Sequence, residues 1–161
     1  MKIRIGQGFD VHAFAEQRKL MLGGIEIDYH LGLAGHSDAD VLIHAMCDAL
    51  LGAAGLGDIG HHFPDDDPQY EGIDSAKLLT AVMQSLNRLG WSVGNVDATV
   101  IAQKPRLASY IPAMRTRLAG LLDVDVAACN VKATTTEKLG FTGRGEGIAA
   151  QAVVLLHQMT D

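Results

Sequence analysis

Apolar and polar residues alternate along several stretches of the chain, which is the pattern of β-strands with one buried face. The alternation and the β-branched content predict strands over residues 2–14 and 91–101, and a strand that runs into a polar turn over 130–138. Residues 20–27 predict a further strand, or a hairpin around a Gly-Gly turn. Residues 148–157 are almost continuously apolar, so we expect a strand covered on both faces, by helices on one side and by another subunit on the other.

The segments between these strands show the periodicity of helices. Apolar residues recur every three or four positions over residues 38–51 and 109–122, which predicts a helix in each stretch. The same period predicts a helix between these two, capped by Asp74 and ended by Gly90. The stretch 55–68 between the first two helices holds three glycines, two prolines and four aspartates. It predicts a long loop, and loops of this length inside compact domains are usually functional or mobile.

Composition and charge narrow the function classes. The 161 residues carry a net charge of −6 at pH 7, which argues against a nucleic-acid surface. An anionic ligand would therefore need positive charge from metal ions, helix ends or a few basic side chains. No apolar run approaches the ~18 residues of a transmembrane helix, so we expect no membrane partner. Cys47 and Cys129 form no C-x-x-C pair and are expected as buried free thiols, which favours a cytoplasmic protein.

Three side chains predict a metal site. Asp10 and His12 lie two residues apart on a predicted strand and therefore point to the same side. His44 lies in the first predicted helix, which begins at Asp38 or Asp40 as its N-cap. One carboxylate oxygen and two imidazole nitrogens leave a fourth position open, as in catalytic zinc sites. On spacing alone an alternative stays open, in which these are an ordinary helix histidine and ordinary polar residues at a strand end.

Other polar residues suggest contacts with anions or hydroxyls. His36 and Ser37 precede the first helix, whose N-terminus attracts anions. The aspartates of the 55–68 loop suit the hydroxyls of a polyol or a cation, or else they belong to a solvated, turn-rich loop. Lys104 and Arg106 stand at a strand-to-helix turn, where they either hold an anion or solubilise the surface.

The last third of the chain adds two candidates. Residues 134–136 are three threonines that, with Glu137, offer hydroxyls and a carboxylate to phosphates and a hard divalent ion. Threonine is also a good strand former, so a purely structural role stays open as well. The Gly-rich segment 139–147 matches neither the P-loop nor the dinucleotide fingerprint, and Arg144 is the charge that it displays.

Seven short segments of the sequence together indicate a protein family more specifically than any one of them does alone. They occur in this order along essentially the whole chain: Gly8–His12, His36–Asp38, Asp40–Val41 with His44, Leu56–Gly60, Phe63–Asp65, Gly94–Asp97 and Val131–Gly147. In these segments the chain resembles the 2-C-methyl-D-erythritol 2,4-cyclodiphosphate synthase family. The resemblance implies a phosphorus–oxygen lyase of the non-mevalonate isoprenoid and terpenoid precursor pathway. Its reaction converts 4-diphosphocytidyl-2-C-methyl-D-erythritol 2-phosphate into the 2,4-cyclodiphosphate and CMP, by metal-assisted intramolecular attack of the 2-phosphate on the β-phosphorus.

The resemblance and the element pattern together imply the architecture. We expect one α+β domain over residues 1–161, with a mixed, mostly antiparallel sheet of about four to five strands and helices packed on one face. The resemblance implies a homotrimer with active sites at the subunit interfaces. Residues 102–108, with Thr134 and Thr135, would form the cytidine pocket for the neighbouring subunit.

The resemblance also implies roles for single residues. Asp10, His12 and His44 would hold zinc or another divalent transition metal, and Glu137 would hold Mg²⁺ or Mn²⁺. The expected catalytic residues, as stabilisers of the transition state, are His36 and Thr135. The residues expected to bind the cytidine diphosphate substrate are Asp10, His12, His36, Ser37, Asp58, Ile59, Gly60, Phe63, Pro64, Asp65, Asp66, Asp67, Ala102, Gln103, Lys104, Pro105, Arg106, Leu107, Ala108, Thr134, Thr135, Thr136, Glu137, Phe141 and Arg144.

Two other functions are consistent with the same metal ligands. The first is a zinc-dependent phosphohydrolase, in which a water molecule attacks the phosphorus and solvent oxygen enters the product. The second is a metal-stabilised binding or assembly module without turnover. Three protein ligands rather than four argue against that second function, because structural zinc sites are closed.

Overall fold

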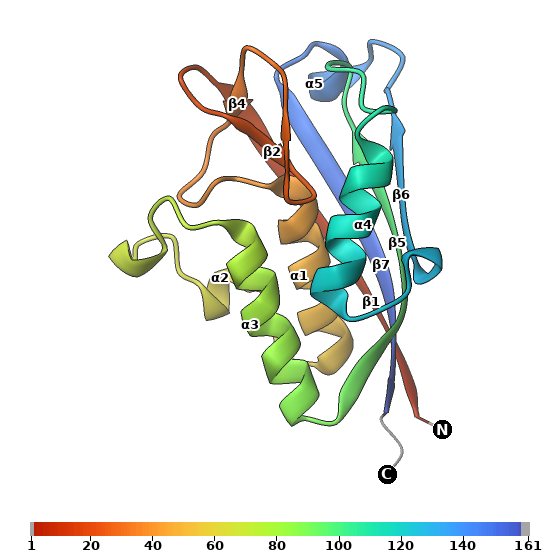
Figure 1. The fold of residues 1–161 in the computed structure, drawn as a ribbon. Helices are drawn as coiled ribbons and strands as arrows, with labels where there is room; N and C mark the ends of the chain where they lie inside the picture. Colours follow the sequence, from red (N-terminus) through yellow and green to blue (C-terminus); the bar gives the residue numbers. More distant parts are fainter. Residues whose placement is uncertain (1, 159–161) are drawn as a thin grey trace.

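A five-stranded sheet with helices on one face forms the body of the protein (Figure 1). The structure is a computed structural model that describes residues 2–158, so the outermost ends of the expected 1–161 domain lie outside it. The strands are β1 (Ile3–Ala15), β2 (Leu20–Leu22), β3 (Ile25–Ile27), β4 (Gly32–Leu33), β5 (Trp91–Ile101), β6 (Cys129–Thr134) and β7 (Gly147–Gln158). The helices are α1 (Val41–Ala54), α2 (Ile59–His62), α3 (Ser75–Arg88), α4 (Ile111–Leu122) and α5 (Gly140–Gly143), with 3₁₀ turns at Pro68–Tyr70 and Val126–Ala128.

The sheet order is β4-β1-β7-β5-β6. The pairs β4–β1, β1–β7 and β7–β5 are antiparallel, and only β6 pairs parallel with β5. The short strands β2 and β3 form a separate hairpin around Gly23 and Gly24. The expected mixed, mostly antiparallel sheet of about five strands, with helices on one face, is therefore confirmed.

Alternation along β1 decides which of its side chains can form a site. Gly6, Gly8, Asp10 and His12 face the helices, whereas Ile5 and its odd-numbered neighbours face the other side. The two glycines allow the backbone of α1 to approach closely, because a Cβ at either position would overlap helix backbone or Cβ atoms. This approach brings one end of α1 beside the end of β1 that carries the aspartate and the histidine.

Asp40 fixes the start of α1. Its buried carboxylate accepts hydrogen bonds from the backbone N–H of Ile43, and also from Gly23 and Gly24 in the hairpin turn. Of the two N-caps that the sequence allowed, the structure selects Asp40. Gly55, in the left-handed conformation, ends the helix.

Two sequence expectations need correction, and a third segment contains a helix for which the sequence made no prediction. The expected loop 55–68 contains α2, a single turn capped by Asp58, and then runs into a 3₁₀ turn, so it is more ordered than its glycines and prolines suggested. The Gly-rich segment 139–147 contains the short helix α5. The helix expected from residue 109 begins at Ile111, because residues 107–110 form a turn closed by the Tyr110 N–H and the Leu107 carbonyl.

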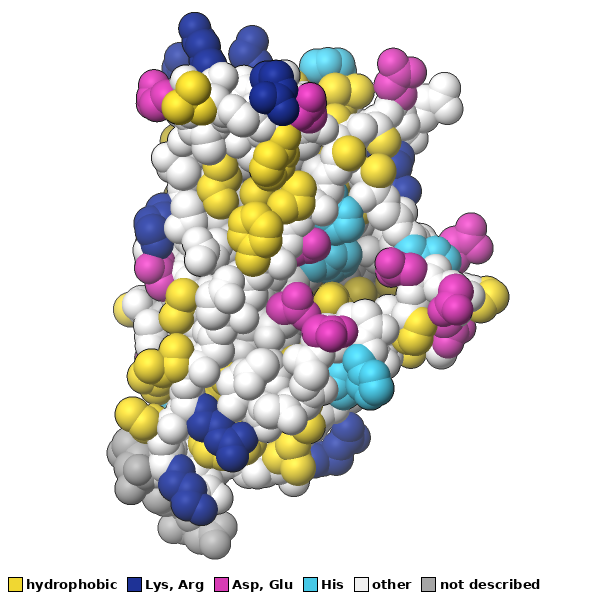
Figure 2. Space-filling view, turned by 180° about the vertical axis from the view of Figure 1, so that it is seen from behind, with side chains coloured by type: hydrophobic (Ala, Val, Ile, Leu, Met, Phe, Trp, Pro, Cys, Tyr) yellow, Lys and Arg dark blue, Asp and Glu magenta, His cyan; other side chains and the backbone are white. Residues whose placement is uncertain are grey.

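The sheet face away from the helices is open in the single chain. Its exposed hydrophobic side chains include Ile5 and Phe9 of β1 and Val153 of β7, at 70%, 55% and 43% exposure. Figure 2 shows hydrophobic side chains on the back of the molecule, beside a hollow edged by His, Asp and Glu. The helices thus cover one face of β7, the last strand. That another subunit covers its other face stays a prediction.

Two further expectations concern cysteines and membranes. Cys47 and Cys129 are free and buried, as expected. Burial raises the pKa of both thiols, which keeps them protonated. Among the described residues, no helix has the length and apolarity needed to cross a bilayer.

Candidate functional site

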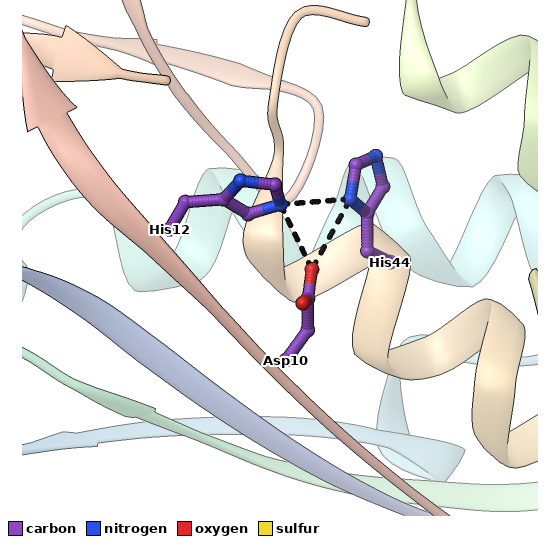
Figure 3. Close-up of side chains that lie close together, drawn as sticks. All are labelled: Asp10, His12 and His44. Atoms are coloured by element: carbon purple, nitrogen blue, oxygen red, sulfur yellow. Dashed lines mark hydrogen bonds and ion pairs between the residues drawn. The ribbon is translucent and has the colours of Figure 1, made fainter. Parts of the chain in front are cut away.

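Asp10, His12 and His44 converge on one point at the end of β1 and the first turn of α1 (Figure 3). His12 Nε2 and His44 Nδ1 lie 2.9 and 3.2 Å from Asp10 Oδ2, and 3.1 Å from each other. The three ligand atoms predicted from sequence spacing therefore come together. Among residues 2–158, this is the one group of three His, Cys, Asp or Glu side chains with metal-ligand spacing.

The spacing of these atoms fits a small divalent metal. Bond lengths of 2.0–2.1 Å to a tetrahedral zinc ion place neighbouring ligand atoms about 3.3 Å apart. The observed separations of 2.9 to 3.2 Å are close to this value, so an ion needs only a slight opening of the triangle. All three side chains are partly buried, and one side of the triangle faces a hollow.

Hydrogen bonds on the far side of each ring aim the ligand atoms inward. His12 Nδ1 lies 2.6 Å from the carbonyl oxygen of Ala34, which can only accept, so this nitrogen carries a proton and the lone pair of a neutral His12 lies on Nε2. His44 Nε2 lies 3.1 Å from Ser37 Oγ and 3.0 Å from Ser75 Oγ. Both imidazoles are thus held by their outer nitrogen, as is usual for metal ligands.

The electrostatics of the triad follow from its geometry. Burial on its own raises the pKa of Asp10. A proton on the facing nitrogen of His12 or His44 donates to the ionised carboxylate, and these hydrogen bonds outweigh burial and hold the pKa of Asp10 well below its ordinary value. Burial on its own lowers the pKa of His12, but the hydrogen bond and charge of Asp10 raise it above the ordinary histidine value. The carboxylate is therefore ionised at neutral pH and ready to ligate a cation.

The hollow beside the triad has a volume of about 170 Å³. Its walls include His36 and Ser37 before α1, and Ile59, Gly60, Phe63 and Asp65 of the 55–68 stretch, all of which the sequence analysis assigned to substrate. It also includes Gly35, Tyr70 and Leu78, which that analysis did not assign. Leu78 carried only the signal of a helix core residue, and Tyr70 carried none.

Four predicted substrate residues of this stretch do not line the hollow. Asp58 caps α2 by accepting from the His61 N–H, and Asp67 caps the following 3₁₀ turn. Asp67 also offers its carbonyl oxygen to His36 Nε2, at 3.0 Å. Pro64 and Asp66 lie in the turn between them and line none of the main hollows. These residues shape the wall rather than form its surface.

A second hollow, of about 270 Å³, lies where β5 and β6 end. It is lined by the other predicted binding segment, namely Ala102, Gln103, Pro105, Arg106, Leu107, Ala108, Ala133, Thr134 and Thr135. Lys104 does not line it, and the bond from Lys104 to Pro105 is cis. The structure thus gathers the expected nucleotide segment into one pocket.

The remaining predicted residues do not line that pocket. Thr136 Oγ1 bonds to the Leu139 carbonyl and to Thr142 Oγ1 within the turn. Glu137 is exposed, with a carboxylate oxygen 3.3 Å from Thr135 Oγ1. Phe141 is 40% exposed, and Arg144 pairs with Glu146 at 3.0 Å.

One chain does not bring the two hollows together. The strands β1 and β6 are separated by β7 and β5, which puts them about 14 Å apart at 4.7–4.9 Å per strand. The two sets of lining residues have no member in common. The metal-ligand cluster and the threonine pocket are therefore separate sites within a single chain.

Comparisons with known proteins point to one family. A model described as the YgbB family matches residues 3–157. The 2-C-methyl-D-erythritol 2,4-cyclodiphosphate synthase of Halalkalibacterium halodurans is 65% identical over 154 residues, covering 96% of this chain and 98% of that protein. The synthase of Thiobacillus denitrificans is 60% identical over 157 residues, covering 98% of each.

Solved structures agree with the sequence matches. The bifunctional IspDF from Campylobacter jejuni superposes with a TM-score of 0.94 and 47% identity, covering 99% of this chain but 43% of that longer one. A structure titled as the CDP complex of IspF from Plasmodium falciparum superposes with a TM-score of 0.86 and 34% identity, covering 98% of this chain and 97% of that one.

Proposed function

This chain belongs to the YgbB family of 2-C-methyl-D-erythritol 2,4-cyclodiphosphate synthases, and from this membership we propose how its residues carry out the reaction. The enzyme is a lyase of the non-mevalonate isoprenoid pathway. It converts 4-diphosphocytidyl-2-C-methyl-D-erythritol 2-phosphate into the cyclic diphosphate and CMP. The cytoplasm remains the expected compartment.

The observation that carries the proposal is the triangle of Asp10 Oδ2, His12 Nε2 and His44 Nδ1, open toward a hollow. Zinc, or another divalent transition metal, is the ion that this set of one oxygen and two nitrogens would hold. When bound, the ion would supply Lewis acidity and neutralise the charge of the diphosphate. An acidic chain can in this way bind a substrate that carries several phosphates.

The substrate supplies its own nucleophile. An oxygen of its 2-phosphate attacks the β-phosphorus, the bond to the CMP oxygen breaks, and CMP leaves with that electron pair. Because both reacting groups belong to one molecule, the protein has to fold the substrate rather than provide a covalent nucleophile. Ile59, Gly60, Phe63 and Asp65 face the hollow and would hold the methylerythritol part.

Two side chains would stabilise the transferring phosphoryl group. His36 lines the hollow beside the triad and is held through Nε2 by the Asp67 carbonyl, so its position is fixed. Thr135 lines the second hollow with its hydroxyl near Glu137. The exposed carboxylate of Glu137 would be one ligand of Mg²⁺ or Mn²⁺. Substrate phosphates would supply further ligands, because a single carboxylate does not complete the coordination of such an ion.

A shared active site would join the two hollows. The relative from Plasmodium falciparum was solved with CDP, and the pocket at residues 102–108 with Thr134 and Thr135 would hold the cytidine diphosphate part here. Since this pocket is about 14 Å from β1 in the same chain, we propose that a neighbouring subunit places its pocket beside the triad. The open, apolar sheet face would be buried in a homotrimer.

Turnover tests the reaction itself. The purified chain, incubated with the cytidine substrate, zinc and magnesium, should release CMP together with the cyclic diphosphate. In isotopically labelled water the product should contain no solvent oxygen, whereas a zinc phosphohydrolase would incorporate it. If CMP is released and the other product carries solvent oxygen on its phosphate, the protein is a phosphohydrolase and the proposed cyclisation is wrong.

Subunit mixing tests the shared site. The variants His12→Ala and Thr135→Ala should each be inactive as pure proteins. Mixed trimers should regain part of the activity, because some interfaces then combine an intact triad with an intact threonine pocket. Mixtures that stay as inactive as the parent variants, although mass spectrometry shows mixed trimers, would contradict a site formed between subunits.

A further inference from the structure

Behind His44 the protein holds a polar chain that no part of the proposed mechanism uses. His44 Nε2 is the nitrogen that points away from the triad, and it lies 3.0 Å from Ser75 Oγ. Ser75 is the first residue of α3. Ser75 Oγ in turn donates a hydrogen bond to Asp38 Oδ1. Ser75 is fully buried, so its hydroxyl has no access to solvent that could substitute for either partner.

The carboxylate of Asp38 is held from several directions. It accepts from the backbone N–H of Ser75 at 3.2 Å and from the backbone N–H of Asp40 at 3.2 Å, in addition to the Ser75 hydroxyl. The backbone N–H of Asp38 donates to the Ile73 carbonyl, and that of Gly72 donates to the His36 carbonyl. The segment before α1 and the segment before α3 are thus fastened to each other.

These contacts fix the direction of each hydrogen bond. An ionised carboxylate can only accept, so the single hydroxyl proton of Ser75 is committed to Asp38. The Ser75 oxygen therefore presents only lone pairs to His44 Nε2. A nitrogen facing lone pairs at 3.0 Å is favoured when it carries the proton, so Ser75 favours the tautomer of His44 whose unprotonated nitrogen is Nδ1. It does so against Asp10 Oδ2, which lies 3.2 Å from Nδ1 and favours a proton there in the metal-free protein.

We propose that Asp38 and Ser75 are positioning residues that favour the tautomer in which His44 ligates through Nδ1. The inference rests on the proposed metal role of His44 but adds residues that do not touch the metal or the substrate. Ser37 Oγ is the second neighbour of His44 Nε2, at 3.1 Å. It accepts from the Ala39 N–H and keeps its own proton free, so it does not fix the tautomer by itself.

The decisive readout is the tautomer of His44 in the metal-free protein. Nitrogen NMR of the imidazoles at about pH 8.5, above the ordinary histidine pKa, should show a share of His44 protonated at Nε2, which Ser75 favours, beside a share protonated at Nδ1, which Asp10 favours. In Ser75→Ala, and in Asp38→Asn, whose amide can donate to Ser75 and free the hydroxyl proton, the proton should redistribute toward Nδ1. Because no metal is present, this result does not depend on whether the proposed function holds.

Zinc affinity is the second readout. In chelator competition Ser75→Ala should bind Zn²⁺ about 10- to 100-fold more weakly than the unaltered protein, the usual cost of losing a partner behind a ligand. The matched control is Ser85→Ala, because Ser85 lies on the same helix but donates only to the Ala81 carbonyl of that helix. This control should keep the unaltered affinity.

The outcomes separate the two proposals. An unchanged His44 tautomer in both variants, with zinc affinity within about threefold of the unaltered protein, would overturn the positioning role. If the unaltered protein binds no more Zn²⁺ than His44→Ala, the proposed metal function fails, while the tautomer experiment still decides the inference. If Ser75→Ala does not fold, the NMR of Asp38→Asn decides it alone.

Discussion

Gly8→Ala is the substitution that most sharply tests how the fold builds the site. Gly8 lies on β1 under α1, and a Cβ there would stand 2.7 Å from the backbone nitrogen of Ala49 and closer still to the carbonyl oxygen of Ala45. Ordinary van der Waals contact begins at about 3.4 Å. The helix therefore has to move away from the strand by more than about 0.7 Å, because both obstacles are backbone atoms that cannot rotate aside.

The shift has two measurable consequences. Forced overpacking costs about 1–3 kcal/mol, and the absence of any side chain that could yield puts this site at the upper end, about 3 kcal/mol. His44 directly precedes Ala45, so the same movement widens the triangle that His44 forms with β1. We expect a lower urea midpoint and weaker zinc binding in the same variant.

Gly52→Ala provides the control within the same helix. The nearest atom to a Cβ at Gly52 is the Gln7 carbonyl oxygen at 4.0 Å, which leaves room for a methyl group. Replacing a helical glycine by alanine should stabilise α1 by about 0.5–1 kcal/mol. Urea unfolding and zinc competition should therefore separate the two variants. A Gly8→Ala protein with unaltered stability and zinc affinity would refute the idea that close strand–helix contact sets the triad.

Three further predictions concern burial and charge. Asp40→Ala leaves three backbone N–H groups without their acceptor and should lower the free energy of unfolding by about 3 kcal/mol; a urea midpoint like that of the unaltered protein would contradict this. Cys47 and Cys129 should resist a thiol reagent in native protein and react only after unfolding; fast labelling would show that they are accessible. Metal-free protein should be most stable between about pH 4 and 6.5. The raised pKa of His12 adds stability that is lost as the pH rises through it, and the lowered pKa of Asp10 adds stability that is lost as the pH falls toward it; an unfolding midpoint equal at pH 5.5 and pH 8.5 would contradict this.

The convergence of Asp10, His12 and His44 was one of two interpretations that the sequence spacing allowed. Asp10 and His12 share a strand face, and His44 falls in the first turns of a helix that the sequence predicted to begin at Asp38 or Asp40. Spacing could not show that the strand and the helix touch at this point. That contact depends on Gly6 and Gly8, whose missing side chains carry no hydrophobic signal.

Other parts of the site lay beyond sequence rules. The helix α2 spans four residues, too few for any period to show, although Asp58 could have been recognised as its cap. Ser75 follows Asp74, and the pair looked like an ordinary helix start. The contact of Ser75 with His44 joins positions 31 residues apart, which only the packing of α3 against α1 brings about.

The direct test of the central claim is the position of zinc in the protein. In crystals grown with zinc, the anomalous signal at the zinc absorption edge should give one peak about 2.0–2.2 Å from Asp10 Oδ2, His12 Nε2 and His44 Nδ1. The same map from His44→Ala should lack it. A peak that persists in that variant, or one that lies away from these three atoms, would contradict the assignment of the triad as the metal centre.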